Sequence, residues 1–228
     1  MPKLPILCYH KVGPIAEEGR RLNIEPARLE EHVRFFKRRG FRFVLPGELD
    51  AAWPKRAVCF TFDDAYASTL ERAPPIFEEN GVRCAFYAVT EKVGMTSDWD
   101  GELARPLATW EALFQAESQG FEIGNHTASH RRLTELTRAE QTLEIKAARD
   151  AFEQRGIACR SLCYPYGAWN QATIEGAQEC GYAVGLALGK QPASENSGLL
   201  LALPRIAVAC RDPITKLLYK IHLRHRLP

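Results

Sequence analysis

The sequence lacks any long apolar run and any marked excess of charge of one sign. No stretch reaches the roughly 18 consecutive apolar residues that a membrane-spanning helix needs. The apolar run at the N-terminus is also too short for the hydrophobic region of a secretory signal peptide, so we expect a cytoplasmic protein. The 30 lysines and arginines nearly balance the 28 aspartates and glutamates. Charge therefore gives no reason to expect nucleic acid as a partner.

The sequence also lacks the cysteine patterns of disulfide-stabilised or zinc-ribbon proteins. Its seven cysteines are odd in number and include no C-x-x-C pair, which fits neither a disulfide framework nor a zinc ribbon. Most of them lie inside apolar runs, where free cysteine behaves as a small buried hydrophobic residue. We therefore expect free thiols in a reducing compartment.

What remains is the composition of an ordinary folded protein, with 46% hydrophobic and 25% charged residues. A length of 228 residues suits one domain. The most loop-like stretch, Gly189–Gly198, is too short to act as a linker between domains. We therefore expect a single domain spanning residues 1–228.

Short β-branched and aromatic runs alternate with segments whose apolar residues recur at i, i+3 and i+4. The expected strands are Pro5–Tyr9, Phe41–Leu45, Ala57–Phe62, Cys84–Val89, Phe121–Gly124, Ser161–Tyr164, Ala183–Ala187 and Arg205–Ala209. The expected helices are Pro26–Arg39, Leu70–Asn80, Thr109–Gln119, Arg138–Gln154 and Ala172–Glu179. A glycine follows each helical segment and precedes a strand, at Gly40, Gly81, Gly120, Gly156 and Gly181. This alternation predicts an α/β fold with a mostly parallel sheet, and about eight strands are enough to close a barrel.

The C-terminal segment Ile214–Pro228 mixes lysines and arginines with large apolar residues. Such a mixture suits either a terminal helix packed on the barrel or a segment in weak contact with an anionic membrane surface. The packed helix is the expectation, and a cytoplasmic protein peripheral to the membrane is the alternative.

Two adjacent carboxylates, Asp63 and Asp64, directly follow the strand Ala57–Phe62. Adjacent side chains at a strand exit point in different directions, so one can bind a metal ion while the other faces a bound water. The alternative is a helix cap, because the residues that follow look helical.

His126 and His130 follow the strand Phe121–Gly124 and are two of only six histidines in the chain. Histidines four residues apart project from the same side of a helical turn and can chelate one ion through neutral imidazoles. A chance pair on a solvated face is the alternative.

A turn of sequence Tyr164-Pro165-Tyr166-Gly167 ends another strand. Such a turn exposes backbone N–H groups that can bind an oxyanion, and aromatic surface on which a sugar ring can stack. It can equally be a structural turn.

In this order and spacing, these three segments resemble the first three motifs of the polysaccharide deacetylase family, also called the NodB homology domain or carbohydrate esterase family 4. The matching residues are Thr61–Asp64, His126–His130 and Tyr164–Gly167. The opening Pro5–Val12 and the late Leu203–Ile206 resemble the bacterial envelope-glycan branch, which includes poly-N-acetylglucosamine deacetylases. The resemblance spans nearly the whole chain.

The resemblance implies a distorted (β/α) barrel of seven or eight strands and a hydrolase that removes N-acetyl groups from an amino sugar. It implies that Asp64, His126 and His130 bind a divalent metal, with zinc expected and cobalt, nickel or iron as alternatives. Asp63 would be the general base, and the N–H of Tyr166 would stabilise the oxyanion. The expected substrate is an N-acetylated glycan or a lipid-linked sugar.

The sequence departs from the family pattern at several positions. Ala65 replaces the usual glycine, and Cys163 replaces the arginine that in many members orients the base, which leaves Arg205 or Arg160 as a substitute. The late tryptophan and histidine motifs are not recognisable. His10 ends the first strand and would emerge on the same rim as the metal ligands. In the branch that the chain resembles, an early histidine replaces the late one, so His10 is the expected general acid, with a simple capping role as the alternative.

Two other functions compete with deacetylation of a glycan. Relatives on this fold hydrolyse small ureide-type amides, for which a closed pocket is expected. A non-catalytic glycan-binding relative is the second rival, and the intact Asp63 argues against it. The sequence leaves the sugar and the oligomeric state open.

Overall fold

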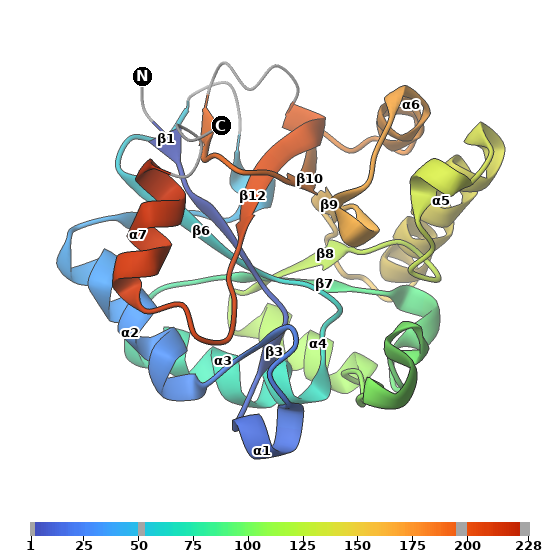
Figure 1. Ribbon diagram of the computed structural model, residues 1–228. Helices are drawn as coiled ribbons and strands as arrows, with labels where there is room; N and C mark the ends of the chain where they lie inside the picture. Colours follow the sequence, from blue (N-terminus) through green and yellow to red (C-terminus); the bar gives the residue numbers. More distant parts are fainter. Residues whose placement is uncertain (1–2, 50–52, 195–199, 224–228) are drawn as a thin grey trace.

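The computed structural model describes residues 3–49, 53–194 and 200–223, and seven parallel strands close a barrel at its centre (Figure 1). These strands are β2 (Ile6–Tyr9), β6 (Ala57–Phe62), β7 (Ala85–Ala88), β8 (Glu122–Asn125), β9 (Ser161–Cys163), β10 (Val184–Leu188) and β12 (Leu203–Ala207). Around the barrel they follow the order β2-β12-β10-β9-β8-β7-β6, and β6 pairs with β2 to close it. The predicted (β/α) barrel is confirmed.

One of the eight expected strands, Phe41–Leu45, is present but does not join the barrel wall. It is β5 (Arg42–Phe43), which pairs with β6 alone and is shorter than expected. Two small pairings lie outside the barrel. In one, β1 (Lys3–Leu4) runs antiparallel to β11 (Ala193–Ser194), and in the other β3 (Lys11–Val12) runs parallel to β4 (Asn23–Ile24).

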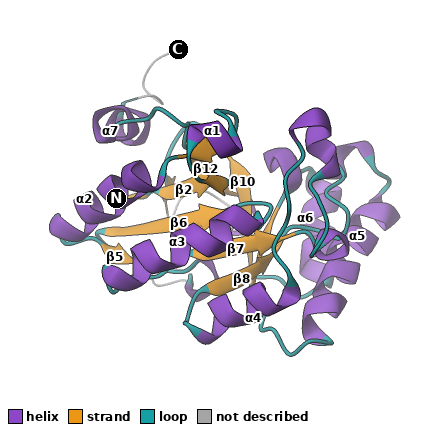
Figure 2. Ribbon diagram, turned by 90° about the horizontal axis from the view of Figure 1, so that it is seen from below, coloured by secondary structure: helices purple, strands orange, loops and turns teal. Residues whose placement is uncertain are grey.

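Helices cover the outside of the barrel (Figure 2). The α-helices are α1 (Ile15–Glu18), α2 (Pro26–Arg38), α3 (Ala67–Glu79), α4 (Trp110–Ser118), α5 (Arg138–Glu153), α6 (Gln171–Glu179) and α7 (Ile214–His222). Short 3₁₀ turns are η1 (Pro46–Glu48), η2 (Thr90–Lys92), η3 (Asp98–Leu103), η4 (Leu133–Glu135), η5 (Pro165–Gly167) and η6 (Leu200–Ala202). The five glycines expected at helix ends all have φ between 63° and 87°, a conformation that favours glycine and lets the chain leave a helix for a strand.

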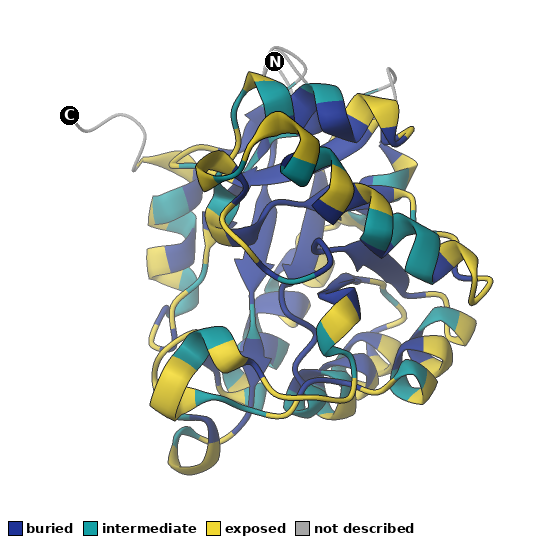
Figure 3. Cartoon of the chain, turned by 90° about the vertical axis from the view of Figure 1, so that its right-hand side faces the viewer, coloured by how far each residue is buried: buried dark blue, intermediate teal, exposed yellow. Residues whose placement is uncertain are grey.

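The strands are buried on both faces, as Figure 3 shows by their dark colouring. Outward-facing side chains such as Phe60 and Phe62 pack with Phe77 of α3 in one aromatic cluster. Burial of each such ring contributes about 1.5–3 kcal/mol. Inward-facing positions include small side chains such as Cys59 and Ala85, and the barrel interior also holds the large, fully buried Arg205.

The C-terminal segment forms the expected packed helix. In α7, Leu217 and Ile221 are buried and the helix lies beside α2 (Figure 1). Lys216 and Lys220 form ion pairs with Asp212. Arg224 and Arg226, on which the expected membrane contact partly rests, lie outside the described residues. No helix in the described ranges is long and apolar enough to cross a bilayer.

Candidate metal centre and active site

A pocket of about 360 Å³ opens at the rim where the barrel strands end. Its floor contains five residues that the sequence singled out, namely His10, Asp63, Asp64, His126 and His130. They are close together because the parallel strands β2, β6 and β8 all end at this rim. Its other lining residues include Arg21, Leu22, Trp99, Asp100, Arg132, Tyr166 and Leu188.

Three potential metal ligands converge at one point on this floor. Asp64 Oδ1 lies 3.3 Å from His126 Nε2 and 3.2 Å from His130 Nε2. All three side chains are buried, and one ligand atom from each lies within 4.8 Å of the others. These are the three residues that the family resemblance implies as metal ligands.

The backbone that brings the two histidines together is not the expected helical turn. Residues 126–130 form an irregular loop in which Thr127 and His130 have φ of 67° and 64°. Side chains hold this loop, since Asn125 Oδ1 accepts from Thr127 N at 2.6 Å and Glu144 Oε2 accepts from Ser129 N at 2.9 Å. The expectation of a helical turn was wrong because left-handed backbone at non-glycine residues leaves no periodicity in a sequence.

The two imidazoles are oriented by different neighbours. His126 Nδ1 lies 2.8 Å from the carbonyl oxygen of Cys163, which directs Nε2 toward Asp64. The His130 ring contacts two aromatic rings, with its centroid 4.0 Å from that of Trp99 and 4.8 Å from that of Tyr166. Sequence reasoning missed Trp99, although its position after strand β7 places it on this rim.

Arg205 resolves the question of which arginine orients Asp63. Its guanidinium is fully buried inside the barrel and donates to Asp63 Oδ1 at 2.6 Å and Oδ2 at 2.7 Å. It also donates to Thr61 Oγ1 and to the carbonyl of Ala187, which fixes its plane. The other candidate, Arg160, lines a hollow at the opposite end of the barrel.

This ion pair decides the charge of Asp63. Burial alone would raise the pKa of the carboxyl group, but the charge and hydrogen bonds of Arg205 outweigh burial and bring the pKa well below its ordinary value. Asp63 is therefore ionised at neutral pH and can accept a proton.

Two thiols complete the surroundings of Asp63. Cys8 Sγ lies 3.4 Å from Asp63 Oδ2, and Cys163 Sγ lies 3.5 Å from Oδ1. Cys163, which stands where many family members have an arginine, thus still contacts Asp63, because a thiol is a weak hydrogen-bond donor. The strong orienting contact is still the one from Arg205.

His10 lies on the same side of Asp63 as the pocket, with Nε2 3.9 Å from Asp63 Oδ2. Burial lowers the pKa of His10, and the nearby charges of Asp63 and Asp64 oppose this effect without cancelling it. The imidazole is thus close to the base and lies against the pocket, although it makes no short contact with either aspartate.

Backbone strain is concentrated at this site. Among the described residues other than glycine, seven have positive φ, and five of them lie in the site segments: Asp64, Ala65, Thr127, His130 and Tyr166. Ala65 has φ of 49° where the family has glycine, which costs about 1 kcal/mol. Strain of this kind persists where the surrounding structure holds residues for function.

The turn that carries Tyr166 approaches β10 closely. A Cβ atom on Gly167 would lie 2.6 Å from the backbone nitrogen of Leu188, so only glycine fits there. The Tyr166 side chain is 46% exposed at the rim of the pocket, where an apolar ring can contact a sugar.

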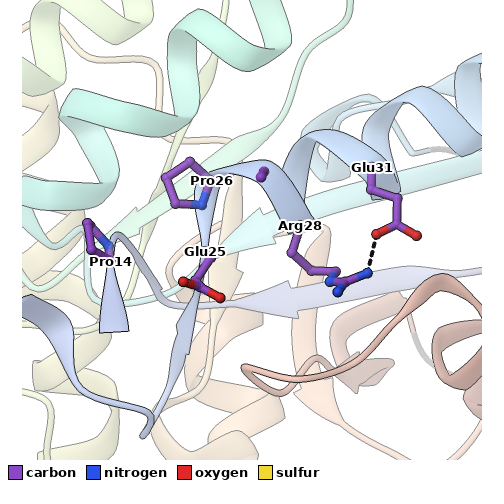
Figure 4. A pocket seen from close by; sticks show the side chains of 6 residues that line it. Pro14, Glu25, Pro26, Arg28 and Glu31 are labelled. Atoms are coloured by element: carbon purple, nitrogen blue, oxygen red, sulfur yellow. Dashed lines mark hydrogen bonds and ion pairs between the residues drawn. The ribbon is translucent and has the colours of Figure 1, made fainter. Parts of the chain in front are cut away.

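Other hollows lack this chemistry. The hollow in Figure 4 has a volume of about 510 Å³ and lies at the start of α2, where it is lined by Pro14, Glu25, Pro26 and the ion-paired Arg28 and Glu31. None of the potential metal-ligand groups in the described part of the chain lies there.

The chain resembles known proteins in sequence and in fold. Residues 50–185 match the model of a family described as polysaccharide deacetylase. Over 214 residues the chain is 25% identical to YxkH of Bacillus subtilis (strain 168), a protein named as a polysaccharide deacetylase, and the match covers 91% of this chain and 72% of that one.

Solved structures share the fold. Streptococcus pyogenes deacetylase PplD, solved in complex with acetate, matches with a TM-score of 0.81 at 24% identity, covering 97% of this chain and all of that one. IcaB from Ammonifex degensii matches with a TM-score of 0.79 at 22% identity, covering 96% of each chain. At these identities the likeness establishes the barrel fold.

Proposed function

Because the chain belongs to the polysaccharide deacetylase family, we propose that it is a metal-dependent hydrolase that removes N-acetyl groups from an amino sugar of a glycan. One observation carries the proposal. Three buried metal-ligand side chains converge beside a carboxylate that a buried arginine keeps ionised. Metal binding and proton removal are thereby assigned to adjacent residues, Asp64 and Asp63.

The chemistry of the ligand set fits a divalent ion. Asp64 Oδ1 is buried and has no hydrogen-bond partner in the described part of the chain, although two imidazole nitrogens approach it. One carboxylate and two imidazoles suit zinc, with cobalt, nickel or iron as alternatives, and leave coordination positions for water and substrate. A bound ion of this kind lowers the pKa of a coordinated water and polarises a carbonyl group.

Asp63 is the group that removes the proton from the attacking water. Its anionic form is maintained by Arg205, and its position next to Asp64 in the chain brings it to the edge of the metal site. As the water proton passes to Asp63, a bond forms between the water oxygen and the acetyl carbon. The N–H of Tyr166 donates to the acetyl oxygen as negative charge develops there.

His10 supplies the proton that the leaving amine requires. An unprotonated amide anion is too poor a leaving group, so the bond between carbon and nitrogen breaks as nitrogen receives a proton. His10 is the histidine against the pocket that does not belong to the ligand set. The products are acetate and the free amino sugar.

The shape of the rim supports a glycan over a small ureide. Tyr166, Leu188 and Leu22 are 46%, 42% and 37% exposed around the pocket mouth. A sealed pocket for a small molecule would bury such side chains, whereas an open rim admits one unit of a longer chain.

Metal analysis and acetate release test the proposal together. We expect the purified protein to contain one divalent ion per chain and to release acetate from N-acetylglucosamine oligomers. Chelation should abolish release, and added zinc should restore it. Asp64→Ala is the matched variant that should lack both the ion and the activity. Acetate release that survives complete metal removal would contradict the metal-dependent mechanism.

A further inference from the structure

Two arginines, Arg21 and Arg132, line the pocket and take no part in the proposed chemistry. They come from segments far apart in the sequence. Arg21 precedes β4, and Arg132 follows the loop that carries His130. Both therefore bring a positive charge to the rim above the catalytic floor.

Arg132 is held in place by an aromatic ring. Its guanidinium carbon lies 4.4 Å from the centroid of the Tyr166 ring, which also contacts His130. Its Nε lies 3.4 Å from Glu135 Oε1. The terminal nitrogens have no ion pair or hydrogen bond with any described residue. A guanidinium that is fixed over a ring, with free N–H groups, can bind an oxyanion in bidentate fashion.

Arg21 lies on a loop whose backbone is fixed. The next residue, Leu22, has φ of 54°, and its carbonyl oxygen accepts from Lys11 N at 2.8 Å. The exposed Arg21 side chain has no ion pair or hydrogen bond within the described residues. Its charge is therefore available to a ligand in the pocket.

The acidic groups of the pocket do not neutralise these arginines. Asp63 is paired with Arg205, and Asp64 belongs to the ligand set. Asp100 accepts hydrogen bonds from Ser97 Oγ of its own loop at 2.8 Å and from Tyr66 Oη at 2.6 Å, and it forms no ion pair with Arg21 or Arg132. An anion that reaches the rim therefore meets the Arg21 guanidinium, which has no ion pair with any described residue, and the terminal N–H groups of Arg132, whose ion pair with Glu135 is made through Nε.

We infer that the substrate carries an anionic group, a phosphate or a carboxylate, next to the N-acetylated sugar, and that Arg21 and Arg132 bind it. This inference rests on the proposed deacetylation and narrows its substrate class. The arginines are specificity-determining residues. They contact the substrate away from the acetyl group, so their loss affects KM more than kcat.

The test compares a neutral and two anionic substrates of the metal-loaded protein. These are the methyl glycoside of N-acetylglucosamine, N-acetylglucosamine 1-phosphate, and a disaccharide of glucuronic acid and N-acetylglucosamine. We expect a higher kcat/KM for at least one anionic substrate, and the better of the two identifies phosphate or carboxylate as the group. The preference should shrink as ionic strength approaches about 1 M, where charges are screened within about 3 Å.

The chain offers a matched control for each arginine. Arg21→Gln and Arg132→Gln should each reduce the preference about three- to tenfold, chiefly through KM. Arg20→Gln and Arg131→Gln remove the adjacent exposed arginines, which do not line the pocket, and should leave the preference unchanged. Equal kcat/KM on neutral and anionic substrates, or equal effects of Arg21→Gln and Arg20→Gln, would overturn the inference.

A binding measurement separates this inference from the proposed function. Calorimetry on the Asp63→Asn protein with N-acetylglucosamine 1-phosphate, the acidic disaccharide and the methyl glycoside needs no turnover. Tighter binding of either anionic sugar that Arg21→Gln weakens supports the anion site even if no substrate releases acetate. Equal binding of all three sugars overturns it, even if the methyl glycoside is deacetylated.

Discussion

Each end of the barrel holds a buried carboxylate, one with a cationic partner and the other with neutral hydrogen-bond donors. Asp63 follows the carboxyl end of β6 and receives two hydrogen bonds from the Arg205 guanidinium. Glu122 begins β8 at the other end and receives hydrogen bonds from neutral donors, with Ser161 Oγ at 2.5 Å and Gly47 N at 2.9 Å.

The different partners give the two groups opposite pKa shifts. Arg205 overcomes the effect of burial and lowers the pKa of Asp63, whereas burial prevails at Glu122 and raises its pKa. A fixed cation keeps a buried carboxylate charged and ready to accept a proton. Neutral donors suffice for a carboxyl group with a structural role. Glu122 connects strands in this way, because Ser161 Oγ donates to it and lies 2.6 Å from Tyr87 Oη.

The sharpest test of this difference removes the charge at position 63 alone. Asp63→Asn should keep the bound metal, because Asp64 and the two histidines are intact, and should lose about 10²–10⁴-fold in turnover. Metal analysis and acetate release measure the two effects. Asp64→Asn provides the comparison, and loss of metal from Asp63→Asn but not from Asp64→Asn would reverse the two roles.

Removing the cation should make Asp63 resemble Glu122. Arg205→Met leaves a buried carboxylate without a partner, so we expect a loss of about 3–5 kcal/mol in the free energy of unfolding. The pKa of Asp63 should rise, and the acid limb of kcat/KM should move to higher pH. Adding Asp63→Asn to this variant should recover much of the stability, as measured by urea unfolding. Equal losses in the presence and absence of Asp63 would show that the pair is not coupled.

The proton donor gives a smaller and pH-dependent effect. If His10 protonates the leaving amine, activity falls as pH rises through its pKa, and burial places that pKa below the ordinary value of about 6.5. A pH profile of kcat/KM should therefore show an alkaline limb, and His10→Ala should remove it without metal loss. Wild-type activity in His10→Ala would assign the proton to another group.

The smallest expected effect concerns Glu122 and is a change in the pH dependence of stability. Because the pKa of Glu122 is raised on folding, its contribution to stability is present below its unfolded pKa of about 4.3 and is lost as pH rises through the folded value. Glu122→Gln should remove this pH dependence and leave metal binding unchanged. Urea unfolding between pH 4 and pH 8 measures it. A dependence that persists in the variant would place its source elsewhere.

Sequence patterns predict the local parts of this molecule well. Strand and helix periodicity predicted the barrel, and the resemblance of contiguous motifs to a known family implied Asp64, His126 and His130, which the structure brings together. The choice between Arg205 and Arg160 could not be made from sequence, because it depends on which end of the barrel each arginine faces. Trp99 and the two rim arginines belong to no pattern, since loops place them against a site built by distant strands.

The closing of the barrel has a consequence for how the chain folds. Leu7 of β2 pairs with Ile206 of β12, and the matched family segment 50–185 contains neither strand. The first barrel strand therefore keeps an open edge until almost the whole chain is available, and joining such distant segments costs loop entropy and slows folding. His10 directly follows β2, and Arg205 lies in β12. We expect the proton-transfer half of the site to assemble last, so that a refolding protein captures its metal before it gains activity.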